Sequence, residues 1–245
     1  MERATQERRP RIALVLSGGG ARGAYEAGVI RYLREGLERE TGIAPRFDIL
    51  CGTSVGGIHA GVLAATAHVP GVQARILAES WLTLRPHALI EAHPGDLLRF
   101  VAGLVGIPVA RSPRHGGLLG TGQLEALVTG ACDWGRIGSN LQAGHLAAVS
   151  ISATHVASGQ TVVFVQTADG RVPPWSRDPR VRAVPAQIGP QHALASAALP
   201  LLFPPVAVDG QFLLRRRLAP EHAALSGPAS GGRSRADRVV APLTA

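Results

Sequence analysis

The 245-residue sequence contains no lysine, so all 25 of its basic residues are arginines. This absence excludes a nucleotide-binding P-loop, whose signature needs a lysine. Only two cysteines are present, Cys51 and Cys132, which argues against a disulfide framework. We interpret both as buried thiols. The sequence predicts neither a metal site nor a cofactor, because the histidines also lack metal-ligand spacing to nearby acids, as at His145, His155 and His192.

Long hydrophobic runs are also missing. The longest, residues 97–110, contains Arg99 and a proline and is shorter than the roughly 20 residues of a spanning helix. We favour an ordinary buried helix there over an interfacial lid across a lipid cleft. Residues 1–11 are polar and basic, and the apolar run at 12–16 is too short for a signal-peptide core. We therefore expect a cytoplasmic protein, without signal peptide or transmembrane helix, that can touch a membrane peripherally.

The formal charge of +8 is compatible with nucleic-acid binding, but aromatic residues make up only 4% of the chain, which weakens that interpretation. Half of that charge lies in residues 212–245, which contain six arginines and only two acidic residues, Glu221 and Asp237. The other arginines are scattered and form no stripe with aromatics. We therefore expect no nucleic-acid partner, whereas attraction to anionic lipid headgroups remains open.

The first 70 residues alternate strand and helix patterns. Apolar runs at 12–16 and 47–51 predict buried strands, each followed by a glycine turn and a helix, at 24–41 and 54–67. This alternation predicts an α/β fold with a parallel sheet covered on both faces. The helix at 24–41 should bury Ala27, Ile30, Leu33 and Leu37 and expose Arg31, Arg34, Glu35 and Glu38.

The remainder of the chain gives weaker patterns and no convincing linker. We predict one domain over residues 11–211, between a polar tail at 1–10 and a basic, poorly ordered tail at 212–245. Within the domain we expect helices at 71–84, 121–129 and 191–198, strands at 145–154 and 161–166, and a surface loop at 169–185.

The sharpest motif is Gly52-Thr53-Ser54-Val55-Gly56, a G-x-S-x-G between a predicted strand and a predicted helix. A serine in such a tight turn lies exposed at a helix N-terminus, and its strained backbone needs glycines two residues to either side. In this context the motif predicts that Ser54 is a nucleophile rather than a plain turn residue.

A second glycine turn, Gly18-Gly19-Gly20-Ala21-Arg22-Gly23, also joins a strand to a helix. Its unobstructed N–H groups suit a phosphate or an oxyanion. A dinucleotide site is disfavoured, because the acid expected about 20 residues later is only Glu40 at a helix end. Arg22 either polarises this loop or solvates the helix start. Because both strands end at the same sheet edge, we expect the loop to lie beside Ser54 and supply an oxyanion hole.

Together these motifs resemble patatin-like phospholipases, as does the segment Ser196-Ala-Ala-Leu-Pro200 through Phe203-Pro204-Pro205-Val206. The resemblance covers residues 11–211. It implies a three-layer α/β/α sandwich with a central, mostly parallel sheet, and a Ser–Asp dyad that needs no histidine. Ser54 would attack a phospholipid or other fatty acyl ester, and an Asp in a D-G-G or D-G-A motif would accept its proton. Asp209 is the candidate for that role.

The acidic motif departs from the family pattern, because Gln211 follows Asp209-Gly210 and an arginine-rich tail follows Phe212. In the family pattern, Gln-Asn-Thr-Pro-Leu follows soon after the acidic motif. If codons for these five residues are preceded by a C and read one base early, they encode Pro220-Glu221-His222-Ala223-Ala224 instead. We interpret the tail as a local shift of reading frame, which resequencing of the coding DNA would test. Asp209 would then be a stand-in for the true base.

Two rival interpretations follow from the same region. A Ser54–Asp209–His222 triad has the order of α/β-hydrolases, but His222 lies only 13 residues after Asp209, inside the aberrant tail. His59 is better explained by packing or surface exposure than as a base, and Asp48 by local hydrogen bonds. The second rival is a remnant that keeps the fold without catalysis.

Overall fold

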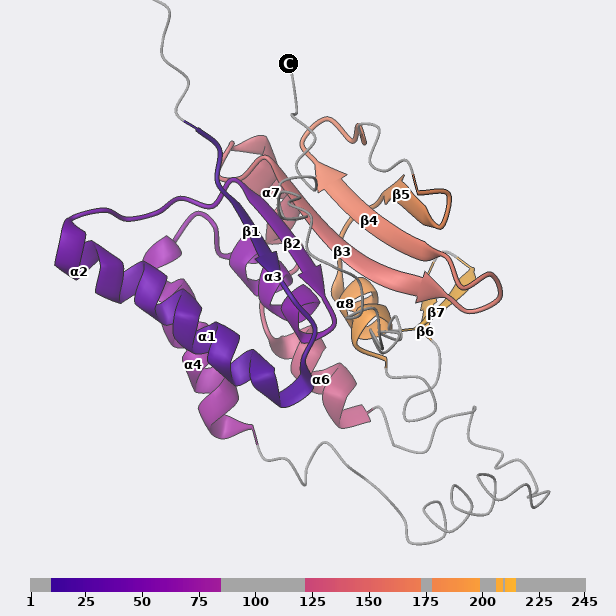
Figure 1. The fold of residues 1–245 in the computed structure, drawn as a ribbon, viewed down its shortest axis with the longest axis horizontal. Helices are drawn as coiled ribbons and strands as arrows, with labels where there is room; N and C mark the ends of the chain where they lie inside the picture. Colours follow the sequence, from indigo (N-terminus) through magenta and orange to yellow (C-terminus); the bar gives the residue numbers. More distant parts are fainter. Residues whose placement is uncertain (1–9, 85–121, 173–177, 199–205, 209, 215–245) are drawn as a thin grey trace, which may run out of the picture.

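The computed structural model describes residues 10–84, 122–172, 178–198, 206–208 and 210–214 (Figure 1). Its strands form one mixed sheet in the order β1-β2-β3-β4-β5, with β7 joined to β3 and to β6. The pairs β1–β2, β2–β3 and β4–β5 are parallel. The strands are β1 (Ala13–Leu16), β2 (Ile49–Thr53), β3 (Ala148–His155), β4 (Thr161–Thr167), β5 (Val181–Pro185), β6 (Val206–Val208) and β7 (Gln211–Leu214).

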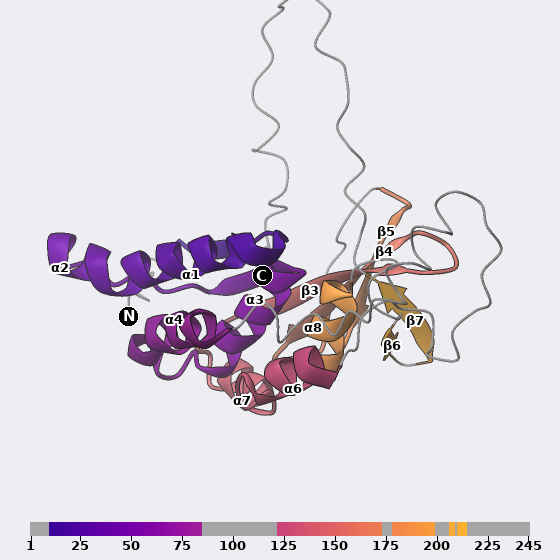
Figure 2. The same ribbon diagram turned by 90° about the horizontal axis from the view of Figure 1, so that it is seen from below.

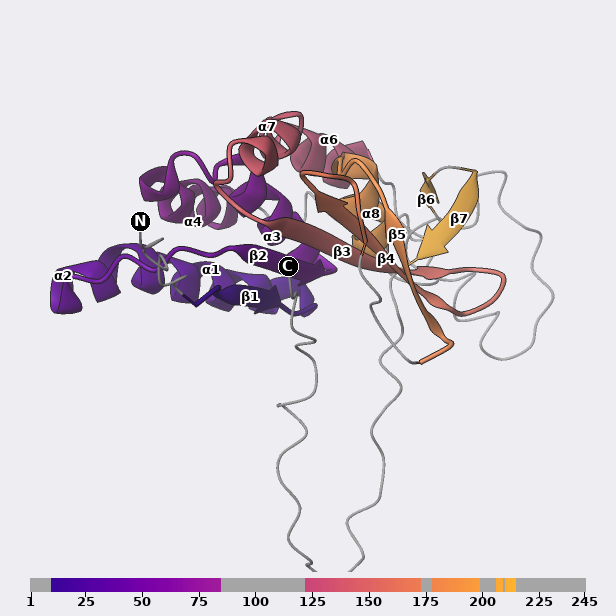
Figure 3. The ribbon, with the colours of Figure 1, turned by 90° about the horizontal axis from the view of Figure 1, so that it is seen from above.

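Helices pack against this sheet and against one another. The helix α3 contacts β1, β2 and β3, α8 contacts β3 and the β6–β7 hairpin, and α1 packs along α4 (Figures 2 and 3). The predicted class, α/β with a mostly parallel central sheet, is confirmed. The helices are α1 (Gly23–Arg31), α2 (Leu37–Thr41), α3 (Val55–Ala65), α4 (Gln73–Thr83), α6 (Gly122–Gly130), α7 (Arg136–Gln142) and α8 (Pro190–Ala197). Within the described segments, none of them has the length and hydrophobicity needed to cross a bilayer.

In the helix α3, nine of the eleven residues are buried. Its small residues let it approach the sheet, and Ala60, Leu63 and Ala64 are fully buried. At Gly61 an added Cβ would lie 2.3 Å from the Trp134 ring, so the indole packs directly on the helix backbone. This close packing fixes the start of α3, and with it the turn that precedes it, against β2.

The predicted helix at 24–41 forms, with Ala27 and Ile30 buried and Arg31 and Glu38 exposed as predicted, but its solvent face differs at Arg34 and Glu35. A π-helical turn, Tyr32–Gly36, joins α1 to α2. The extra residue in a π turn rotates the residues that follow relative to a regular helix. Arg34, predicted to be exposed, is half-buried, and its guanidinium lies 4.2 Å from the centre of the Phe47 ring.

Two further differences concern weakly patterned segments. The predicted loop at 169–185 ends in a strand, β5, which tolerates Arg182 and Pro185 because it pairs only with β4 in the described sheet. The β6–β7 hairpin was not predicted, and the boundary proposed at residue 211 falls inside β7, where Leu213 is fully buried. The stretch at 97–110 lies outside the described residues.

Candidate active site

Ser54 occupies the turn between β2 and α3 in a strained conformation. Its φ of 57° and ψ of −126° make it the one non-glycine residue with positive φ in the described part of the chain. Such a conformation costs of order 1–3 kcal/mol and persists only where the surroundings enforce it. Its neighbours enforce it here: a Cβ on Gly52 would lie 2.3 Å from the Gly56 carbonyl oxygen. The turn therefore has the geometry of a nucleophile elbow.

Hydrogen bonds from two other elements hold this turn. The Ser54 N–H donates to the Ser196 Oγ at 2.7 Å, and that hydroxyl donates to the Ser152 carbonyl at 2.6 Å. The Oγ atoms of Thr53 and Ser152 lie 2.7 Å apart. Ser196 is fully buried on α8, so one hydroxyl ties the candidate nucleophile's backbone to β3. The segment that begins with Ser196 carries part of the family resemblance, but the sequence alone indicated no role for this serine.

The glycine loop starts directly after β1. Gly20 has a φ of 57°, and a single 3-10 turn, Gly20–Arg22, leads into α1. Within the described residues, the amides of Gly18, Gly19 and Ala21 donate to no acceptor, whereas the Arg22 N–H donates to the Gly19 carbonyl. Unpaired amides at a helix start are suited to stabilising negative charge.

The two turns contact each other at both ends of the glycine loop. The registers Leu16↔Gly52 and Thr53↔Ser152 bring β1, β2 and β3 to a common edge. At the start of the loop, a Cβ on Gly56 would lie 2.4 Å from the Leu16 carbonyl oxygen. At its end, a Cβ on Gly23 would lie 2.6 Å from a Val55 methyl carbon. The predicted neighbours are therefore brought together.

Of the two candidate aspartates, Asp48 and Asp209, only Asp48 lies within the described residues. Asp209 is outside the described residues, although Gly210 next to it has a φ of 76° and β7 pairs with the end of β3. Asp48 is at the opposite end of β2 from Ser54, and its carboxylate accepts the Ile12 N–H at 2.9 Å. The local structural role expected for Asp48 is thus confirmed.

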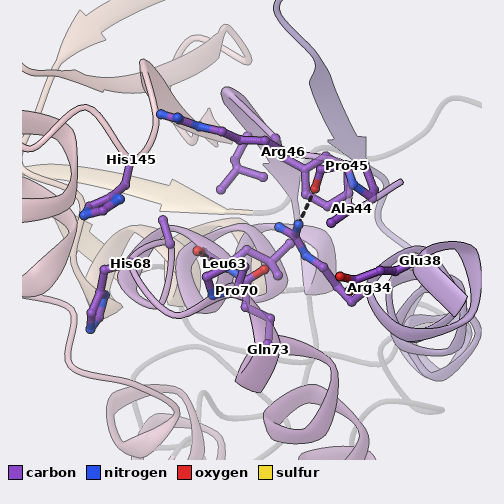
Figure 4. Close-up of a pocket in the computed structure, with 14 residues that line it drawn as sticks. Arg34, Glu38, Ala44, Pro45, Arg46, Leu63, His68, Pro70, Gln73 and His145 are labelled. Atoms are coloured by element: carbon purple, nitrogen blue, oxygen red, sulfur yellow. Dashed lines mark hydrogen bonds between the residues drawn. The ribbon is translucent and has the colours of Figure 1, made fainter. Parts of the chain in front are cut away.

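A cavity among the described residues lies away from Ser54. It measures about 440 Å³ and opens at the amino ends of the strands, between the end of α3 and the segment before β2 (Figure 4). In Figure 4, Arg34 reaches toward Pro45, whose carbonyl accepts a hydrogen bond from it. Burial lowers the pKa of the Arg34 guanidinium. Side chains that line the cavity include Arg34, Arg46, Phe47, His68, Gln73 and His145.

The described residues contain no group of three or more histidine, cysteine, aspartate or glutamate side chains that could hold a metal ion. Cys51 and Cys132 are free thiols and half-buried. Burial raises the pKa of both, with the charge of Asp133 adding to the effect at Cys132, whose pKa is about 12. Neither thiol is therefore an activated nucleophile at neutral pH.

A family model for patatin-like phospholipases matches residues 14–219. The chain belongs to the patatin-like phospholipase family. The match includes both the glycine loop and the Ser54 turn, so the resemblance read from those two motifs is confirmed. Membership also supports a lipid hydrolase in the coarse sense.

Individual relatives are more distant from this patatin-like chain. It is 46% identical over 66 residues to a cGAMP-activated phospholipase of Pseudomonas aeruginosa (strain BWHPSA011 / Pa011), a match that covers 27% of this chain and 19% of that protein. The crystal structure of VipD from Legionella pneumophila aligns over 93% of this chain and 48% of that one, with 17% identity and a TM-score of 0.48. The chain thus spans less than half the length of either relative.

Proposed function

We propose that this chain is a lipid acyl hydrolase that uses Ser54 as its nucleophile. The observation that carries the proposal is the strained backbone of Ser54 in a turn packed against the glycine loop. Strain of this kind is kept at functional sites, and a structural turn would use glycine there. The family's lipid ester chemistry points in the same direction.

The proposed reaction is acyl transfer in two stages. The Ser54 Oγ attacks the ester carbonyl carbon while a carboxylate, for which Asp209 is the candidate, accepts the hydroxyl proton. The amides of Gly18, Gly19, Gly20 and Ala21 stabilise the oxyanion, each donor being worth about 3 kcal/mol of barrier. The alcohol leaves with the proton, and water then hydrolyses the acyl-serine and regenerates Ser54. The substrate class is phospholipids or other fatty acyl esters, reached by peripheral membrane contact.

A second candidate is a folded but catalytically impaired family member. The observation that favours it is Gln211, which stands where the family motif has a small residue after Asp-Gly. In that case the fold and the Ser54 turn persist while no competent base accepts the proton.

Labelling with a fluorophosphonate probe, together with hydrolysis of a p-nitrophenyl fatty acyl ester, tests the proposal. We expect the wild type to label and to hydrolyse, Ser54→Ala to do neither, and Ser139→Ala, an exposed serine on α7, to match the wild type. A loss of at least about 10³-fold in kcat is expected for Ser54→Ala. Asp209→Asn tests the base. A folded wild type that does not label would contradict the hydrolase and favour the impaired form.

A further inference from the structure

Three side chains, one from each of the helices α1, α3 and α4, form a hydrogen-bonded chain that begins at the glycine loop. One carboxylate oxygen of Glu26, on α1, accepts both the N–H of Ser17 at 2.8 Å and its hydroxyl at 3.2 Å. The other carboxylate oxygen lies 3.2 Å from Nδ1 of His59, on α3. Nε2 of His59 accepts the indole N–H of Trp81, on α4, at 2.9 Å. Figure 2 shows these three helices next to one another.

The partners fix the protonation state of His59. An indole N–H is only a donor, so Nε2 facing Trp81 must be unprotonated. A neutral imidazole then carries its proton on Nδ1, which donates to Glu26. His59 is only 2% exposed, and this burial lowers its pKa despite the nearby Glu26 carboxylate, which acts in the opposite direction. The chain therefore runs as donor to acceptor without a break, from Trp81 to Glu26.

The same residues brace both ends of the glycine loop. Ser17, held by Glu26, lies between β1 and Gly18, the first residue of the loop. At the other end, a Cβ on Gly23 would lie 2.4 Å from the Trp81 ring and 2.6 Å from Val55, the residue after Ser54. His59 itself is one turn further along α3. The loop is thus tied to the helix that carries the candidate nucleophile.

We propose that Glu26, His59 and Trp81 are positioning residues that hold the glycine-loop amides in register with Ser54. This inference rests on the proposed function and adds a second layer to it. No hydrogen bond in the described residues joins Glu26 or His59 to Ser54, so the network orients the oxyanion donors and carries no proton of the reaction. A shift of about 1 Å in such donors can cost about 100-fold in rate.

The hydrogen-bond network predicts a donor–donor conflict in Glu26→Gln. A glutamine presents one oxygen and one NH2 group, while its two neighbours, Ser17 N–H and His59 Nδ1–H, are both donors. Either orientation of the amide faces one donor with another. We expect the rate of Ser54 labelling to fall about tenfold, with KM for the ester unchanged.

A second substitution should relieve that conflict. In Trp81→Phe the indole N–H is gone, so His59 can move its proton to Nε2 and accept the glutamine NH2 at Nδ1. The glutamine oxygen then faces Ser17. We expect the Glu26→Gln/Trp81→Phe protein to label within about threefold of Trp81→Phe alone, a coupling that independent packing losses would not give.

The decisive experiment combines labelling kinetics with hydrogen exchange of the Ser17 and Arg22 amides, two loop amides that donate hydrogen bonds in the structure, in the wild-type chain and variants. His59→Ala should speed that exchange about tenfold, whereas His59→Asn, whose amide can still donate to Glu26, should stay within about threefold. Trp134→Phe is the matched control: it also removes an indole hydrogen bond, to Val128, next to α3 but away from the loop.

The outcomes separate the two proposals. A wild type that does not label contradicts the hydrolase, and the exchange measurement still decides the network. Unchanged exchange of the Ser17 and Arg22 amides in both His59→Ala and Glu26→Gln overturns the positioning role, and so does a double variant that labels more slowly than Glu26→Gln. If His59→Ala does not fold, the glutamine pair and His59→Asn carry the test.

Discussion

The polar groups around Ser54, at the carboxyl edge of the sheet, and those around the cavity, at its amino edge, differ in whether they have hydrogen-bond partners. At the carboxyl edge, Ser54 is strained and its N–H is held by the buried Ser196 hydroxyl. At the amino edge, the residues that line the cavity include Arg34, His68 and Gln73, each with a buried side-chain atom that has no hydrogen-bond partner among the described residues. The cavity alone would direct attention to the amino edge, away from Ser54. Strain sustained by a satisfied hydrogen-bond network is the better marker of a site built for chemistry.

Adding one methyl group at each edge should give the largest contrast. In Gly56→Ala the new Cβ meets the backbone carbonyl of Leu16 at 2.4 Å, and backbone cannot move aside cheaply. We expect a loss of about 3 kcal/mol in the free energy of unfolding, together with loss of labelling. In Gly71→Ala, beside the cavity, the Cβ meets nothing within 4 Å, and the change should stay within about 0.5 kcal/mol. Urea denaturation measures both, and equal effects would contradict the contrast.

Ser196→Ala tests the hydrogen bonds that hold the elbow. It leaves the Ser54 N–H and the Ser152 carbonyl without their buried partner. We expect a loss of about 2 kcal/mol in unfolding free energy. Because the Ser54 backbone is no longer held, labelling should slow about tenfold. Ser80→Ala, which removes an exposed hydroxyl bonded to the Ile76 carbonyl, is the control. Unchanged labelling in Ser196→Ala would show that strand and helix alone hold the turn.

Arg34→Met probes the amino edge. It removes the hydrogen bond to the Pro45 carbonyl and the contact with the Phe47 ring. These contacts predict a loss of about 1 kcal/mol in the free energy of unfolding. Labelling of Ser54 should change by less than about twofold, because no polar contact joins Arg34 to the described residues around Ser54. A large change in labelling would mean that the edges are coupled.

The smallest expected effect is on the stability of the protein at acidic pH. Burial lowers the pKa of His59, so the unfolded chain binds its proton at a higher pH than the folded chain does. Stability should therefore fall as the pH drops below about 6.5, the ordinary pKa of histidine. His59→Asn has no titrating group there and should lose less, by up to about 1 kcal/mol. Thermal unfolding at pH 7.5 and pH 5.5 measures the difference, and parallel losses in both proteins would contradict this origin.

The meeting of the two turns at the carboxyl edge could be predicted from the sequence because the signals for each turn are local. Glycine at positions 52 and 56 reports a close backbone approach that no other residue fits. The roles of Ser196 and of the pair Glu26–His59 could not be read in this way, since their partners lie 142 and 33 residues away. Arg34 was misplaced because a single π turn changes the helical phase without a sequence signature that we recognised.

The parallel pairing of β1 with β2 has a consequence for how this site can vary. Leu16 and Gly52 stand opposite each other on the ladder, so the two turns meet through strand register rather than through their spacing along the chain. Insertions between Gly42 and Ala44, outside the helix and the strand, should leave the site intact. Losing one residue from β1 would instead turn its alternate side chains over and carry the glycine loop away from Ser54.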